Sequence, residues 1–261
     1  MRIILFLLFL SACSSAPITG RKQLKLMPES TLRSQSAVAY KEVLAKSKIE
    51  NHSEDARRVK RVGQRIKAAV ESYFKSQGKS EIIKNYQWEF NLINENTVNA
   101  WAMAGGKVAF YNGIMPICET DAGVAVVMGH EIAHAIAGHS NEGISRALIQ
   151  QFSLVALDAA LSKITKKNVK DAVLASVGVG SSLLLLKYGR NQESEADEMG
   201  LVFMAIAGYD PHEAPRFWQR MQAQDKGHTP EWLSTHPSNE RRIRDLQAKI
   251  PKAMTYFHSS N

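Results

Sequence analysis

Residues 120–140 read TDAGVAVVMGHEIAHAIAGHS, and within this stretch His130, Glu131 and His134 form the pattern H-E-x-x-H. An α-helix turns once in about 3.6 residues, so the side chains of His130 and His134 should lie one above the other on one face. Two imidazoles so arranged can bind one zinc ion, and Glu131 would lie near the ligand position that remains. The stretch therefore predicts a helix that carries two metal ligands and a carboxylate beside them.

The same stretch predicts this helix without reference to the motif. Thr120 or Asp121 can cap its first turn, and Gly138 stands where a C-terminal glycine is expected. Most of the other residues are apolar, so we expect the helix to be buried and its His and Glu side chains to need polar partners. A chance match is the competing interpretation, at a frequency on the order of one per cent in a chain of this length.

The third ligand decides the class of metal site. A histidine in the longer pattern H-E-x-x-H-x-x-G-x-x-H is excluded, because Ala137 and Ser140 occupy the required glycine and histidine positions. The later segment 190–198, RNQESEADE, offers carboxylates instead. We predict that Glu193 is the third ligand. Asp197, one turn further along the same face, is expected to accept the outer N–H of a zinc-bound histidine or to help shuttle a proton.

Three polar residues near these motifs are predicted to lie at the surface. Glu195 and Glu198 fall on the side of the acidic helix that should face water. His139 follows the glycine that ends the motif helix, so we expect it to be a surface or capping residue.

The N-terminus predicts export and lipid attachment. Residues 1–12 have a positive start and an apolar core, as in a signal peptide, and Leu10-Ser11-Ala12-Cys13 resembles a bacterial lipobox. We expect residues 13–29 to be a lipidated N-terminus and tether with the lipid on Cys13, although plain signal cleavage is the alternative. Ser14 in place of aspartate favours the outer membrane, by resemblance to lipoprotein sorting. Cys118 would then be the only free thiol.

Composition is typical of a globular protein. The chain has 261 residues, of which 44% are hydrophobic and 22% charged, and we expect residues 30–261 to form one domain. The segment 172–186 is too short for the roughly 20 residues of a spanning helix and is predicted to be a buried core helix. The positive charge behind the net charge of +8 is concentrated on a predicted helix at 55–76. This basic face could be a solvated surface or a surface that attracts anionic partners. No nucleic-acid motif accompanies it.

The predicted fold class is α+β and predominantly helical. Alternating apolar residues predict a half-buried strand at 86–93, and 98–103 and 107–111 around two glycines predict a β-hairpin beside the motif helix. The edge of that hairpin could bind an extended peptide as one more strand, or could be merely structural. Helices are predicted at 30–48, 55–76, 143–161, 169–188, 191–207, 211–224 and 240–249.

Several motifs in order resemble one family. H-E-I-A-H, then E-x-x-A-D from Glu193 to Asp197, then Thr235-His236-Pro237-Ser238 with Arg242, is similar to the zinc metallopeptidase family of HtpX and the CAAX prenyl endopeptidases. The resemblance spans about residues 22–243 and includes the family's substrate-edge hairpin, here Asn99, Ala100, Trp101 and Ala102. It implies a zincin-like domain with one Zn²⁺ per chain and the peptide along the hairpin. Because no spanning segments are predicted, the chain is most similar to the lipid-anchored periplasmic branch.

The resulting functional hypothesis is a zinc endopeptidase. Glu131 would take a proton from the metal-bound water and pass it to the leaving amine. His236 and Arg242 could reach the open side of the metal and stabilise the oxyanion, or His236 could be a fourth ligand that keeps the enzyme latent. By resemblance, the substrates are misfolded or misassembled envelope proteins at the periplasmic face of the outer membrane. The alternative is an assembly chaperone with a structural zinc.

Overall fold

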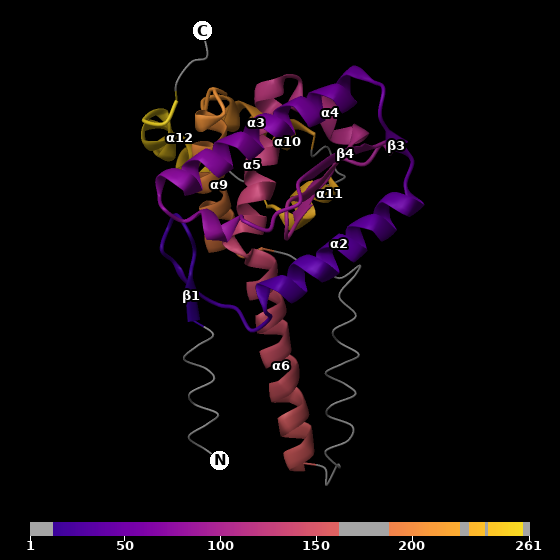
Figure 1. Cartoon of the computed structure of the whole chain (residues 1–261), viewed down its shortest axis with the longest axis vertical. Helices are drawn as coiled ribbons and strands as arrows, with labels where there is room; N and C mark the ends of the chain where they lie inside the picture. Colours follow the sequence, from indigo (N-terminus) through magenta and orange to yellow (C-terminus); the bar gives the residue numbers. More distant parts are fainter. Residues whose placement is uncertain (1–12, 162–187, 225–229, 238–239, 258–261) are drawn as a thin grey trace.

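The computed structural model describes residues 13–161, 188–224, 230–237 and 240–257 (Figure 1). The expected signal peptide, the expected core helix at 172–186 and Ser238 lie outside the described residues. Among the helices of the described ranges, none combines the length and apolar character that crossing a bilayer requires.

The N-terminal segment packs on the domain. β1 (Cys13–Ser15) and β2 (Lys22–Leu24) pair antiparallel. Ala16 and Gln23 are buried, and Gln23 Nε2 donates to the carbonyl of Ala137 at 2.8 Å. Much of the segment that the sequence suggests as a tether is therefore attached to the end of the motif helix, because its polar side chains find buried partners there.

Two helices follow along one side of the molecule. They are α2 (Glu29–Lys46) and α3 (Glu54–Ser76), with the short strand β3 (Ile49–Glu50) between them. Ser53 caps α3 by accepting from Ala56 N, and the apolar positions of α3 recur at helical spacing and are buried. On its basic face, Arg58 and Arg61 pair with Asp121 at the start of the motif helix, so this face is not entirely free in solvent.

The predicted hairpin is confirmed, but it belongs to a mixed sheet. β5 (Ala100–Met103) and β6 (Lys107–Tyr111) pair antiparallel, whereas β4 (Glu89–Ile93) pairs parallel with β6 and antiparallel with β3. The strand order β3-β4-β6-β5 places β5 at an edge. Gly106 turns the hairpin with a φ of +84°, and a Cβ there would lie 2.7 Å from the Trp88 ring. The shorter elements are η1 (Ser80–Ile82), η2 (Asn112–Ile114) and α4 (Met115–Cys118).

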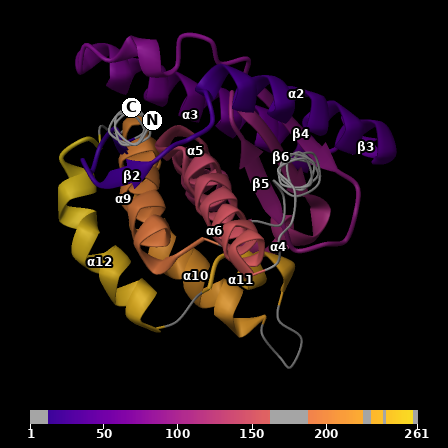
Figure 2. The same ribbon diagram turned by 90° about the horizontal axis from the view of Figure 1, so that it is seen from below.

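The motif helix, α5 (Asp121–Ala137), has the predicted ends and runs through the middle of the fold. The Thr120 side chain accepts from Gly123 N, and Gly138 ends the helix in the left-handed conformation with a φ of +74°. Seen from below, α5 lies between the sheet and the helix that carries the acidic segment (Figure 2). α6 (His139–Leu161) then extends away from the body of the molecule (Figure 1).

The acidic segment forms α9 (Arg190–Ile206), which packs directly against α5. The contact is close because Gly129 and Gly200 face each other, and a Cβ on Gly200 would lie 2.9 Å from the backbone nitrogen of His130. α10 (Glu213–Ala223), α11 (Glu231–Thr235) and α12 (Glu240–Met254) complete the domain, with α12 covering α9. The fold is therefore α+β and mostly helical, as predicted.

Candidate metal centre

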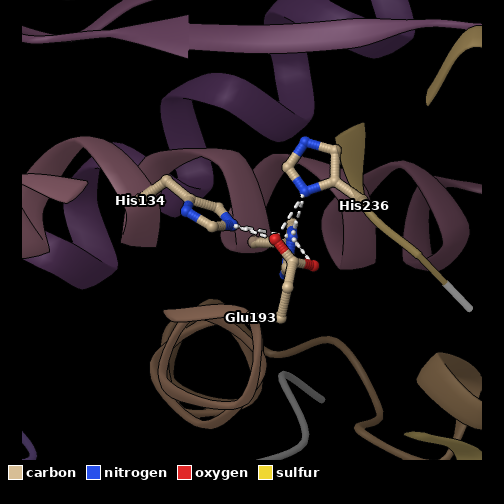
Figure 3. A group of neighbouring side chains, drawn as sticks. His134, Glu193 and His236 are labelled. Carbon is tan, nitrogen blue, oxygen red and sulfur yellow. Dashed lines mark hydrogen bonds and ion pairs between the residues drawn. The ribbon is translucent and has the colours of Figure 1, made fainter. Parts of the chain in front are cut away.

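Four buried side chains converge where α5 and α9 meet. His130 and His134 come from α5, Glu193 from the first turn of α9, and His236 from the residue after α11; their possible ligand atoms all lie within 4.8 Å of one another. Figure 3 shows His134, Glu193 and His236 pointing toward one another. The two distant helices thus bring together the ligands that the sequence predicts, with His236 as a fourth donor.

Four of the separations within this cluster are close to those in a tetrahedral metal site. His130 Nε2 lies 3.0 Å from His134 Nε2 and 3.2 Å from His236 Nδ1. Glu193 Oε1 lies 3.3 Å from His134 Nε2 and 3.0 Å from His236 Nδ1. Zinc bonds of about 2.0–2.1 Å give a tetrahedron whose edges are roughly 3.3 Å. Three imidazoles and one carboxylate at these separations fit one zinc ion.

The charge of Glu193 suits a metal ligand. Burial opposes ionisation of its carboxyl, but His236 and Arg242 beside it hold the pKa of Glu193 well below the usual value. The carboxylate therefore remains charged in the folded protein, and its Oε2 contacts Arg242 Nη1 at 2.6 Å.

Asp197 lies where the sequence predicts it. Its Oδ1 is 3.0 Å from His130 Nδ1, the ring nitrogen that faces away from His134. Burial opposes ionisation of Asp197, but Arg242 and His130 keep its pKa below the usual value. A carboxylate in this position fixes the orientation of a ligating imidazole and raises its basicity.

Arg242 lies against the ligand cluster, where it pairs with two carboxylates. Its guanidinium contacts Glu193 and Asp197, with Nη2 2.7 Å from Asp197 Oδ1, and stacks over the Trp218 ring at 3.7 Å. The cleft along β5 does not include Arg242. Two buried carboxylates attract the guanidinium more strongly than an open cleft would, so this geometry favours an organising role over the predicted substrate contact.

Glu131 is held by an indole that the sequence does not single out. Trp232 Nε1 donates to Glu131 Oε1 at 2.8 Å, although the two residues are 101 positions apart. The backbone nitrogen of Trp232 donates to the carbonyl of Val98, two residues before β5 begins. His236 Nε2 lies 3.5 Å from the same Glu131 oxygen. α11 therefore contacts both the carboxylate and the residues that lead into the edge strand.

His139 and Glu195 correct the surface prediction. Their exposed fractions are 0% and 4%, and His139 Nε2 lies 2.9 Å from Glu195 Oε2. On the other side, His139 Nδ1 lies 2.8 Å from Nδ1 of His134. Burial is possible because each polar atom has a partner. Glu198, by contrast, is more exposed and pairs with Lys252, as expected for a residue that faces water.

The predicted substrate residues line a cleft beside the cluster. Asn99, Ala100, Trp101 and Ala102 on the β5 side face Glu131, Tyr188 and His236 across it, along with other residues. The Tyr188 ring stacks on His134 with centroids 3.9 Å apart. An edge strand in this position could pair with an extended peptide.

Comparison with known proteins places the chain in a family. Residues 55–250 match the model of peptidase family M48. Over 250 residues the chain is 32% identical to the mitochondrial metalloendopeptidase OMA1 of Schizosaccharomyces pombe, covering 94% of this chain and 68% of that protein. It is 33% identical over 190 residues to OMA1 of Saccharomyces cerevisiae, covering 70% and 52%, and 29% identical over 168 residues to the beta-barrel assembly-enhancing protease of Escherichia coli, covering 61% and 34%. The chain therefore belongs to peptidase family M48 and is a zinc metalloendopeptidase.

Proposed function

We propose that His130, His134 and Glu193 hold one catalytic zinc ion and that the chain hydrolyses extended segments of misfolded or misassembled cell-envelope proteins. The observation that carries this proposal is the position of the ligand cluster. It lies beside Glu131 and opens onto a cleft along the edge strand β5. A bound zinc ion supplies a Lewis acid and a water whose pKa is lowered to about 7.

The roles of the side chains follow from their positions. Glu131 takes the proton of the attacking water and later gives it to the leaving amine. Asp197 holds His130 by its outer nitrogen, and Arg242 holds the carboxylates of Glu193 and Asp197. The backbone of β5 aligns the substrate as an added strand, which imposes little side-chain preference and suits unfolded protein.

These positions support a latent state of the enzyme, with His236 as a fourth zinc ligand. With His236 among the ligands, the zinc would have four protein donors, and the position that a catalytic zinc keeps for water would be filled. Trp232 at the same time occupies a lone pair of the general base. Cleavage then requires α11 and His236 to withdraw from the cluster.

The test of the function is Glu131→Gln in a cleavage assay with an unfolded protein. We expect cleavage to fall by a factor of about 10²–10⁴, the usual size of a general acid–base contribution, while zinc binding persists. Undiminished cleavage would contradict the peptidase mechanism. Full function in the envelope despite lost cleavage would instead favour the chaperone alternative.

The cellular location is part of the proposal. The lipobox-like Leu10-Ser11-Ala12-Cys13 supports a lipid anchor on Cys13 at the periplasmic face of the outer membrane. One relative is a bacterial protease named for β-barrel assembly, which supports envelope substrates, whereas others are mitochondrial. We expect the chain to incorporate labelled palmitate and to fractionate with outer membranes. Cys13→Ser should abolish both; labelling of the Cys13→Ser variant would contradict the anchor.

A further inference from the structure

A series of buried, hydrogen-bonded side chains leads away from the metal centre on the far side of His134. His134 Nε2 faces the ligand cluster, and its other nitrogen, Nδ1, lies 2.8 Å from His139 Nδ1. His139 Nε2 in turn lies 2.9 Å from Glu195 Oε2. His139 is on α6 and Glu195 on α9, so the series links two elements across the end of α5.

When His134 binds the metal, only one assignment of donors and acceptors satisfies every hydrogen bond in this series. A ligating His134 offers the lone pair of Nε2, so its neutral ring carries the hydrogen on Nδ1. That N–H donates to His139 Nδ1, which must therefore be an acceptor and leaves its own hydrogen on Nε2. The Nε2–H of His139 then donates to the Glu195 carboxylate. The tautomers that metal binding requires are therefore compatible with both of these short distances.

Glu195, at the far end of this series, is held by the N-terminal segment. Arg21 Nε donates to Glu195 Oε2 at 2.7 Å, and the hydroxyl of Thr19 donates to Glu195 Oε1. Thr19 and Arg21 both lie between β1 and β2, which sit beside α9 (Figure 2). Both oxygens of Glu195 are thus occupied, and the carboxylate is fixed for its contact with His139.

We infer that His139 is a positioning residue for the metal ligand His134, and that the N-terminal segment 13–24 takes part in the metal centre through Arg21 and Glu195. The inference rests on the proposed zinc site. His139 would orient the ring of His134 as Asp197 orients that of His130. The difference is that the imidazole of His139 lies between the ligand and the carboxylate of Glu195. Partners of this kind change metal affinity by about 10–100-fold when they are removed.

The test is the zinc affinity of the full chain, measured by competition with a chromophoric chelator. His139→Leu fills the space without a polar atom and should weaken zinc binding by about 10–100-fold. His139→Gln offers a carbonyl oxygen toward His134 and an N–H toward Glu195, so it should restore most of the affinity. Glu195→Leu should weaken binding similarly, and Arg21→Ala less, since Thr19 still holds the carboxylate.

Matched controls separate positioning from packing. Glu198→Leu, on the same helix but paired with Lys252, and Lys22→Ala, next to Arg21, should leave zinc affinity within twofold of the wild type. Melting temperatures of the metal-free variants report any packing effect. If His139→Leu lowers the melting temperature but binds zinc as tightly as His139→Gln does, the positioning role is wrong.

The outcomes also distinguish this inference from the proposed function. A wild-type chain that binds no zinc contradicts the proposed metal centre itself. A wild-type chain that binds one zinc and cleaves unfolded protein, together with undiminished affinity in His139→Leu, overturns the inference alone. If the His139 variants do not fold, Glu195→Leu against Glu195→Gln decides, because the amide keeps an acceptor for His139.

Discussion

His236 and Trp232 engage the two groups that peptide hydrolysis would need free. His236 Nδ1 lies 3.2 Å from His130 Nε2 and 3.0 Å from Glu193 Oε1, within the ligand set. Trp232 donates its indole N–H to Glu131. The indole thus occupies an oxygen of the carboxylate that has to accept the proton of the water, and a zinc ion with four protein ligands would have no open position for that water. The two contacts come from one short segment, so they can be released together.

Replacing His236 by alanine tests this latency. We expect His236→Ala to raise the turnover of an unfolded protein at saturating zinc by about tenfold or more, which corresponds to a barrier lowered by about 1.4 kcal/mol. The physical reason is that the fourth position becomes available to water. Turnover of the purified variant is the measurement, with His212→Ala, a histidine at an exposed turn, as the control.

The other outcomes of this substitution are equally informative. A fall of about 10²–10³ in turnover would support oxyanion stabilisation by His236 instead of latency. Unchanged turnover would contradict both roles.

At the level of residues, the parts of the site that lie at helical spacing in the sequence were predictable. A helix converts a sequence interval of three or four into spatial proximity, so Glu131 and the ligands of α5 and α9 follow from local patterns. His139 does not, because Gly138 in the left-handed conformation ends α5 and redirects the chain. Glu195 lies off the predicted buried face, and its burial is possible because His139 on α6 and Thr19 and Arg21 of the N-terminal segment supply partners.

At the level of elements, the metal centre depends on how closely α5 and α9 approach. Gly129 and Gly200 face each other, and a Cβ on Gly129 would lie 2.9 Å from the carbonyl oxygen of Gly200. Any larger residue would push the helices apart and move Glu193 away from His130 and His134. The two glycines therefore allow ligands on separate helices to come close enough to bind the same metal ion.

Helix positions were predictable because their signals are local. The acidic helix, predicted at 191–207, lies at Arg190–Ile206, and the amphipathic helix predicted at 55–76 lies at Glu54–Ser76. Apolar spacing predicts both within a few positions, and Ser53 caps the start of the second. The order of the strands was not predictable in this way. The parallel pairing of β4 with β6 passes over β5, which lies between them in the sequence, and no local pattern specifies it.

At the scale of the whole molecule, three distant parts of the chain meet at Glu142. Its carboxylate accepts from Arg21 of the N-terminal segment at 2.8 Å, from Arg146 on α6 at 2.6 Å, and from Gln192 on α9 at 2.9 Å. Gln192 precedes the ligand Glu193, and its side-chain oxygen accepts from Gly189 N at the start of α9. The ends of α6, α9 and the β1–β2 segment are thus fastened by one buried acid.

This convergence predicts a pH dependence of stability. Burial opposes ionisation of Glu142, but Arg21 and Arg146 outweigh it and lower its pKa from 4.5 to about 2. Because the folded-state pKa lies below the unfolded value, the stabilisation is fully present above about pH 4.5 and is lost as the pH falls toward 2. The side chain of Arg146 is 55% exposed, so solvent screening limits the contribution to roughly 1–2 kcal/mol.

The measurement is the free energy of unfolding of the wild type and of Glu142→Gln at several pH values, with a chelator present so that metal loss does not contribute. The difference between the two proteins should be constant from about pH 5 to 7 and should shrink between about pH 4.5 and 2, because only the wild type has this carboxylate to protonate. Glu81→Gln, at a side chain that is 81% exposed, should show little difference at any pH. A Glu142→Gln difference as large at pH 3 as at pH 7 would mean that contacts which the amide cannot make, and not the charge of Glu142, hold these three elements together.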